Sequence, residues 1–79
     1  MWSEGTIEIK NPNGTKVPVR YWAKHYDEPS PWGIENGRIS KLTLKQGEET
    51  VCNYDRAVDI PAKTPEAQAA LAILMQKYN

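Results

Sequence analysis

Residues 64–79, TPEAQAALAILMQKYN, form the one segment whose sequence predicts a helix throughout. Thr64 is a suitable N-cap, because its hydroxyl can accept from a free backbone N–H, and Pro65 fits the first helical position. Glu66 near the start and Lys77 near the end complement the helix dipole. Apolar residues at three- and four-residue spacing predict one buried face of Ala67, Ala70, Leu71, Leu74 and Tyr78, with Ile73 widening it and Met75 on its flank.

A helix of this length is marginal on its own in water, because nucleation is costly. Its apolar face must pack against another element, where each buried Leu or Ile contributes roughly 1.5–3 kcal/mol. The small alanines allow close approach to a flat surface, so we expect the helix to cover a sheet. The alternative is a helix that inserts into a groove of a partner protein, and core packing is preferred.

Alternating apolar and polar residues predict four strands before the helix. These strands span residues 5–10, 16–26, 38–45 and 50–56. Asn13-Gly14 and Gln46-Gly47-Glu48 predict tight turns after the first and third strands, and therefore two hairpins. Residues 57–63 are expected to cross to the helix, with Val58 and Ile60 as anchors.

Residues 27–37, DEPSPWGIENG, predict a loop, because two prolines, two glycines and a terminal Asn-Gly interrupt any regular pattern. Trp32 and Ile34 are unusual in a solvated loop. We therefore expect them to fold back on the sheet or on the helix end. Turn geometry is the expected reason for Gly33 and Gly37.

The element order predicts an α+β fold with residues 1–79 as a single domain: a four-stranded antiparallel sheet (ββββ) with the C-terminal helix packed on one face. The helix side is assigned Ile7, Ile9, Val17, Val19, Tyr21, Leu42, Leu44, Cys52 and Tyr54. The other side is assigned Arg20, Trp22, Lys24, Lys41, Thr43, Val51, Asn53 and Asp55. Because one helix cannot cover two faces, the second is open to water or meets a partner. A register error of one residue would exchange the two sets.

Composition restricts the function classes. Ten basic and ten acidic residues give a formal net charge of zero, whereas proteins that bind nucleic acid through phosphates usually carry a basic excess. Cys52 is the only cysteine, which excludes an internal disulfide and fits a reducing compartment. No apolar run is long enough to span a membrane, and the N-terminus lacks signal-peptide features. We therefore expect a cytoplasmic protein with no membrane partner.

No group of residues has the spacing of a catalytic, cofactor or metal site, so we expect a protein that is not an enzyme and has no cofactor or metal. His25 is the only histidine, and a catalytic base needs a positioned partner, so a surface or strand-edge histidine is preferred. Cys52 is expected to be a small buried hydrophobe. Asp55 is expected to form a cross-strand pair with Lys41 or Arg20.

The residues predicted to bind a partner are Arg20, Trp22, Lys24, Trp32 and Lys41. Trp and Arg are enriched at binding hot spots, which favours a protein partner. Cations around an exposed ring on a sheet also suit single-stranded nucleic acid, an alternative that the zero net charge disfavours. Self-association through an edge strand or the second face is a further option.

Short motifs at the start of the chain and in its second half resemble a known family. These motifs are Met1-Trp2 to Ile7, Arg38-Ile39-Ser40-Lys41-Leu42, Asn53-Tyr54-Asp55-Arg56, Thr64-Pro65-Glu66-Ala67, Ala70-Leu71 and Lys77-Tyr78-Asn79. The family comprises short uncharacterised proteins of Firmicutes and their phages. The resemblance implies no activity and no functional residue. It implies a small cytosolic accessory protein of a phage or mobile element and, by analogy, a regulator or inhibitor of a larger host protein such as a defence nuclease.

Overall fold

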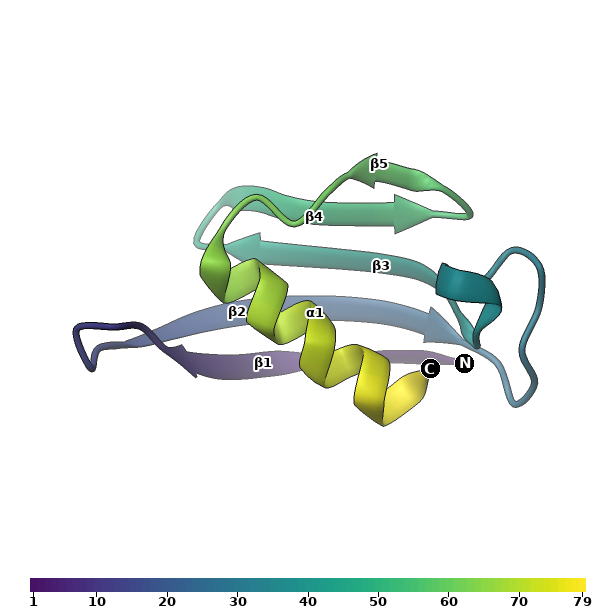
Figure 1. The fold of residues 1–79 in the computed structure, drawn as a ribbon, viewed down its shortest axis with the longest axis horizontal. Coiled ribbons are helices and arrows are strands. Elements are labelled where there is room, and N and C mark those ends of the chain that lie inside the picture. The colour runs from purple at the N-terminus through teal and green to yellow at the C-terminus, as the bar shows by residue number, and fades with distance from the viewer.

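The computed structural model covers residues 1–79 and contains one antiparallel sheet crossed by a single α-helix (Figure 1). Neighbours in the sheet follow chain order: β1 (Trp2–Lys10), β2 (Lys16–His25), β3 (Ile39–Gln46), β4 (Glu49–Asp55) and β5 (Val58–Ile60). A 3₁₀ turn, η1 (Ile34–Asn36), lies between β2 and β3, and α1 spans Pro65–Tyr78. The α+β class and the C-terminal helix are confirmed, but the sheet has five strands, not four.

The fifth strand was not predicted because its three residues are too few for a period-two pattern. Arg56 adopts a φ of 62°, a left-handed conformation that turns the chain back so that β5 pairs with β4. Val58 is 66% exposed and does not act as an anchor, whereas Ile60 is half-buried.

Both hairpins are confirmed. In the β1–β2 turn Gly14 has a φ of 83°, and its N–H donates to the Asn11 carbonyl at 2.9 Å. The Asn11 side chain also accepts from the backbone N–H groups of Asn13 and Thr15, each at 3.0 Å. Gly47 supplies the second left-handed glycine, at 62°, between β3 and β4. Glycine adopts this conformation without the steric cost that a side chain brings.

α1 begins as its sequence predicts. Thr64 is the N-cap, with Oγ1 accepting from the Ala67 N–H at 3.0 Å, and Pro65 is the first helical residue. The same hydroxyl donates to Oε1 of Gln46 at the end of β3, which ties the helix start to the sheet. Neither α1 nor η1 has the length and apolar character needed to cross a bilayer.

The buried face of α1 is as predicted except at Ile73, and Leu71, Tyr78 and the flanking Met75 pack against the core in part. Ala67, Ala70 and Leu74 are fully buried, and α1 contacts β1, β2 and β3. Ile73 is 43% exposed and does not widen the face. Consecutive helical residues differ by about 100° in direction, so Ile73 turns away from the sheet when Leu74 faces it.

The predicted assignment of side chains to the two faces is correct except at a bulge. Leu44 pairs with Cys52 but Lys45 pairs with Thr50, so Val51 is an extra residue on β4. Val51 was predicted on the face away from the helix, yet it is buried within the core beside Cys52. A bulge interrupts the alternation of side chains, and the sequence pattern alone did not locate it.

The loop between β2 and β3 folds back only in part. Ile34 packs against the core as predicted, but Trp32 is 62% exposed and lies outside the core cluster. Neither Gly33 nor Gly37 has a positive φ, so turn geometry does not explain them. A Cβ on Gly33 would meet the Gly37 carbonyl, and one on Gly37 would meet the Asn79 side chain, so close packing excludes larger residues.

Asn79 closes this loop onto the sheet. Its Oδ1 accepts from the N–H of the buried Ile39 at 2.9 Å, and its Nδ2 donates to the Ile34 carbonyl at 3.1 Å. One side chain therefore joins the helix end, η1 and β3.

We predict that Asn79→Ala lowers the free energy of unfolding by about 1–3 kcal/mol, because it leaves a buried N–H without an acceptor. Asn79→Asp keeps the acceptor and should lose less. Urea unfolding measures both variants, with exposed Gln76→Ala as the control. Equal midpoints for Asn79→Ala and Gln76→Ala would show that this side chain does not hold the loop.

Candidate functional site

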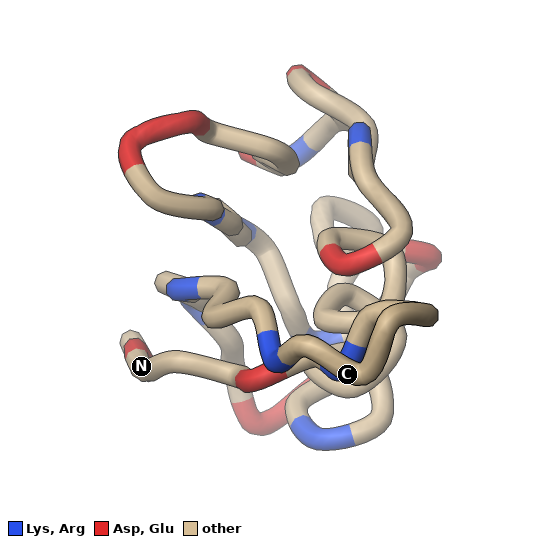
Figure 2. Tube along the Cα trace, turned by 90° about the vertical axis from the view of Figure 1, so that its left-hand side faces the viewer, with Lys and Arg blue, Asp and Glu red and all other residues tan.

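No helix covers the side of the sheet opposite α1 (Figure 2). We call this side the open face. Its side chains come from alternate positions of four strands and are Trp2, Glu4, Thr6, Glu8, Arg20, Trp22, Lys24, Lys41, Thr43, Lys45, Asn53 and Asp55. The same alternation that directs the apolar residues toward α1 directs this set away from it.

Strand pairing arranges these residues in rows across the sheet. The three rows are Trp2–Lys24–Lys41–Asp55, Glu4–Trp22–Thr43–Asn53 and Thr6–Arg20–Lys45. Directly opposed side chains in an antiparallel sheet lie within contact distance. Residues far apart in sequence therefore form one continuous surface.

Cations lie over the aromatic rings of this surface. The Arg20 guanidinium carbon is 5.0 Å from the centre of the Trp22 ring, and Lys45 Nζ is 5.9 Å from it. Lys24 Nζ is 6.0 Å from the Trp2 ring and 5.7 Å from that of Tyr26. Each exposed contact of this kind stabilises by about 0.5–1 kcal/mol. The Lys24 hydrogen bond also lowers the pKa of Tyr26.

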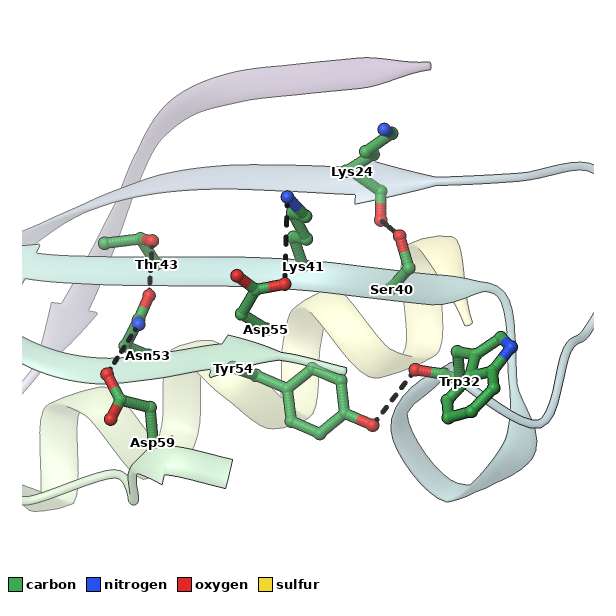
Figure 3. Close-up of polar contacts among 9 residues, drawn as sticks. All are labelled: Lys24, Trp32, Ser40, Lys41, Thr43, Asn53, Tyr54, Asp55 and Asp59. Carbon is green, nitrogen blue, oxygen red and sulfur yellow. Dashed lines mark hydrogen bonds and ion pairs between the residues drawn. The ribbon is translucent and has the colours of Figure 1, made fainter. Parts of the chain in front are cut away.

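Two pairs of like charges face each other across β2 and β3. Arg20 is opposite Lys45, and Lys24 is opposite Lys41. Only Lys41 has an acidic partner, Asp55 on β4, with Nζ and Oδ1 3.7 Å apart (Figure 3). This pair confirms the expected cross-strand contact of Asp55. The other three cations lack a carboxylate within ion-pair distance.

Two consecutive hydrogen bonds between side chains connect β3, β4 and β5 (Figure 3). Thr43 Oγ1 donates to Asn53 Oδ1 at 2.8 Å, and Asn53 Nδ2 donates to Asp59 Oδ2 at 3.0 Å. The Asp59 carboxylate therefore already accepts a hydrogen bond within the sheet.

Two shallow depressions flank Trp22. One, of about 350 Å³, is lined by Trp2, Trp22, Thr43 and Lys45. The other, of about 210 Å³, is lined by Glu4, Gly5, Thr6, Arg20, Tyr21 and Trp22. Both are open to solvent and can receive protruding side chains of a partner.

Four of the five residues predicted to bind a partner lie together: Arg20, Trp22, Lys24 and Lys41 share the open face. Trp32 does not join them, because it lies on the loop at the end of the sheet (Figure 3). Its carbonyl accepts from the Tyr54 hydroxyl at 3.2 Å, and its ring makes no contact with the four.

Two residues that take part in the cation–ring contacts, Trp2 and Lys45, were not among the predicted contact residues, and both had a signal in the sequence. Trp2 is 58% exposed and lies at the start of β1, three residues before the predicted strand. It continues the alternation of Glu4 and Thr6. Lys45 continues the alternation of Lys41 and Thr43 to the next position of β3.

His25 lies at the end of β2, on the helix side. Its ring stacks on Tyr78 with centroids 4.4 Å apart, and its Nε2 is within hydrogen-bond distance, 2.9 Å, of the Ser3 hydroxyl. Burial, then the charges of the Met1 ammonium and Arg38, lower the pKa of His25, and Asp27 opposes them. No carboxylate bonds to the ring, so Ser3 and His25 lack the third group that orients a catalytic base.

Cys52 is buried on the helix side, and burial raises the pKa of its thiol. It lies at an apolar groove of about 170 Å³ between β4, β5 and α1. A thiol in such surroundings stays protonated and unreactive. No three His, Cys, Asp or Glu side chains converge as metal ligands would.

We predict that stability falls as the pH falls through the range in which His25 titrates. The folded state lowers the pKa of His25 from 6.5, so the unfolded chain binds the proton more readily. The stabilising contribution is complete above the unfolded-state pKa and is lost as the pH falls through the folded-state pKa. Urea unfolding at about pH 7.5 and pH 5.5 measures the loss, and His25→Gln should reduce it. An unchanged loss in His25→Gln would contradict this assignment.

Comparison with known proteins places the chain in a family without assigning an activity. No curated protein and no solved structure matches the chain. The family described as Domain of unknown function (DUF7678) matches residues 1–79. Since that match covers the whole sequence, the chain belongs to the DUF7678 family.

Proposed function

We propose that this chain is a non-catalytic module that binds another protein through the open face. The main support for this proposal is the uncovered sheet face, which presents tryptophan rings and three cations that have no carboxylate partner. Tryptophan and arginine are the residues most enriched at binding hot spots.

The opposed pairs of cations indicate the charge of the partner surface. Cations directly opposite one another destabilise a sheet, so Arg20–Lys45 and Lys24–Lys41 cost stability in the free protein. A carboxylate from a partner, inserted between two such cations, would reverse the sign of that interaction. The proposed partner surface is therefore acidic around an apolar group that meets Trp22.

The family resemblance adds a more specific proposal about the role of this binding. It suggests a phage or mobile-element protein that regulates or inhibits a larger host protein, such as one of a defence system. A small exposed contact face suits such a role, because inhibition needs only occupancy of the partner's surface.

Nucleic-acid binding through the open face is the second candidate. The observation that favours it is the arrangement of Arg20, Lys45 and Lys24 around the Trp22 and Trp2 rings, which resembles a stacking platform for single strands. Glu4 and Glu8 on β1 and Asp55 on β4 border the same face and oppose phosphates.

Trp22→Ala is predicted to weaken partner binding by 2 kcal/mol or more, about thirtyfold, as for a central hot-spot residue. Helix content should be retained, because Trp22 lies outside the core cluster. The loss of its two cation contacts should lower the free energy of unfolding by only about 1–2 kcal/mol, so the variant stays folded. Affinity capture from the native host identifies the partner, and calorimetry with the purified partner measures the affinity. Val58→Ala, an exposed apolar residue at the apolar groove, is the matched control.

Full affinity in Trp22→Ala would refute the open face as the contact surface. A salt titration of the wild type distinguishes the two candidates. Binding through several phosphates weakens steeply with salt, whereas a tryptophan-anchored protein contact changes much less.

A further inference from the structure

The two edges of the sheet differ in their protection against further strand pairing. β5 has three residues, pairs irregularly with β4 and is followed at once by Pro61. Short strands, irregular pairing and proline are the usual devices that prevent edge-to-edge association. β1 has nine residues, pairs with β2 without a bulge and contains no proline. β1 carries the charged side chains Glu4, Glu8 and Lys10 but none of these three devices, so it is the less protected edge.

The hydrogen-bond pattern shows which backbone groups of β1 are free. Met1 and His25 exchange two bonds, with the Met1 ammonium donating to the His25 carbonyl at 3.0 Å and the His25 N–H donating to the Met1 carbonyl at 2.8 Å. In an antiparallel ladder, residue pairs that exchange two hydrogen bonds alternate with pairs that exchange none. Since Met1 belongs to a bonded pair, the odd-numbered residues of β1 bond to β2. The N–H and C=O groups of Trp2, Glu4, Thr6, Glu8 and Lys10 point outward.

The side chains of β1 favour one register for antiparallel pairing with β1 of a second copy. Pairing about Ile7 places Glu4 opposite Lys10 of the second copy and, by symmetry, Lys10 opposite its Glu4. Pairing about Thr6 would instead oppose Glu4 and Glu8, and pairing centred on Glu4 or Glu8 would oppose that residue to itself. Pairing about Gly5 has no charge conflict, but it forms no ion pair. Pairing about Ile9 opposes Glu8 and Lys10, but it joins only residues 8–10 of each β1, whereas pairing about Ile7 joins residues 4–10.

The monomer leaves these charges free. Neither Glu4 nor Lys10 belongs to one of its three ion pairs, and Lys10 lies opposite Lys16 on β2. The centre of the register is Ile7, which is half-buried and packs against the edge of the core on the helix side. Meeting the same residue of a second copy would complete its burial.

We propose that β1 pairs antiparallel with β1 of a second copy about Ile7, which joins two sheets into one sheet of twofold symmetry. Each Glu4–Lys10 contact then occurs twice, as an isologous interface requires. Opposed residues of paired strands point to the same side, so both open faces lie on one side of the joined sheet and both helices on the other. This inference does not rest on the proposed function.

Strand addition alone buries less than the roughly 800 Å² per partner of stable complexes, so the expected dissociation constant is micromolar, about 1–100 µM. Sedimentation equilibrium of the full chain should show a mass that rises from monomer to dimer over that range. Glu4→Lys and Lys10→Glu should each weaken dimerisation at least about tenfold, because each opposes like charges twice. The double variant restores both ion pairs and should recover the dimer. Glu48→Lys, the same charge change in the exposed β3–β4 turn, is the control.

Disulfide trapping tests the register. In a Cys52→Ala background, Ile7→Cys should cross-link on mild oxidation, because Ile7 faces itself in the proposed pairing. Ile9→Cys should not, since Ile9 faces Gly5 and the two introduced cysteines lie four residues apart along the strand, about 13 Å. Thr6→Pro removes an outward N–H while sparing the bonds to β2, and it should abolish dimerisation with the circular dichroism spectrum retained.

A monomeric mass at every concentration up to about 500 µM would overturn the proposal. So would a double charge-reversal variant that stays as weak as the single ones, or cross-linking of Ile9→Cys in preference to Ile7→Cys. Trp22→Ala should leave dimerisation unchanged, so failure of the open-face proposal and failure of this one are observed separately.

Discussion

One helix packed against one side of the sheet is the constraint on which the rest of the structure depends. Ala67 and Ala70 bring α1 close to the strands, and Leu74 fills the space between them. The Thr64 cap, which also bonds to Gln46, and Asn79, which bonds to Ile34 and Ile39, attach the two ends of the helix. Because the core lies between α1 and β1–β4, the opposite side of the sheet contributes little to it and its residues are free to serve another purpose.

The zero net charge conceals an ordered distribution of charge on that side. The adjacent strands β2 and β3 carry the cations Arg20, Lys24, Lys41 and Lys45. The acids Glu4, Glu8 and Asp55 lie on the flanking strands β1 and β4, and Asp59 lies on the edge strand β5. A sum over the whole chain therefore understates the field at the centre of the open face. This distribution of charge also explains why the open face combines features of a protein interface with features of a nucleic-acid platform. The salt dependence of binding therefore distinguishes a protein partner from a nucleic acid.

Much of this arrangement follows from local sequence signals. Alternation placed Arg20, Trp22, Lys24 and Lys41 on one face, and the Thr64–Pro65 cap located the helix start. Three errors have separate physical causes. β5 depends on a left-handed Arg56 and on tertiary pairing, and its three residues have no period of their own. Val51 enters the core because a bulge shifts the register of β4. Gly33 and Gly37 are explained by contacts with residues as distant in sequence as Asn79, which no local turn rule contains.

β1 belongs both to the open face and to the free edge of the sheet. β1 supplies Trp2 and Glu4 to the open face and presents its free backbone groups at the edge. Extending the sheet across β1 would bring the Trp2 rings of two copies to the same side and thus enlarge the open face at its aromatic border. A partner that contacts both halves would then gain affinity from the second contact without any new residue, since that contact becomes intramolecular. The proposed dimer edge and the proposed contact face would in this way form one larger binding surface.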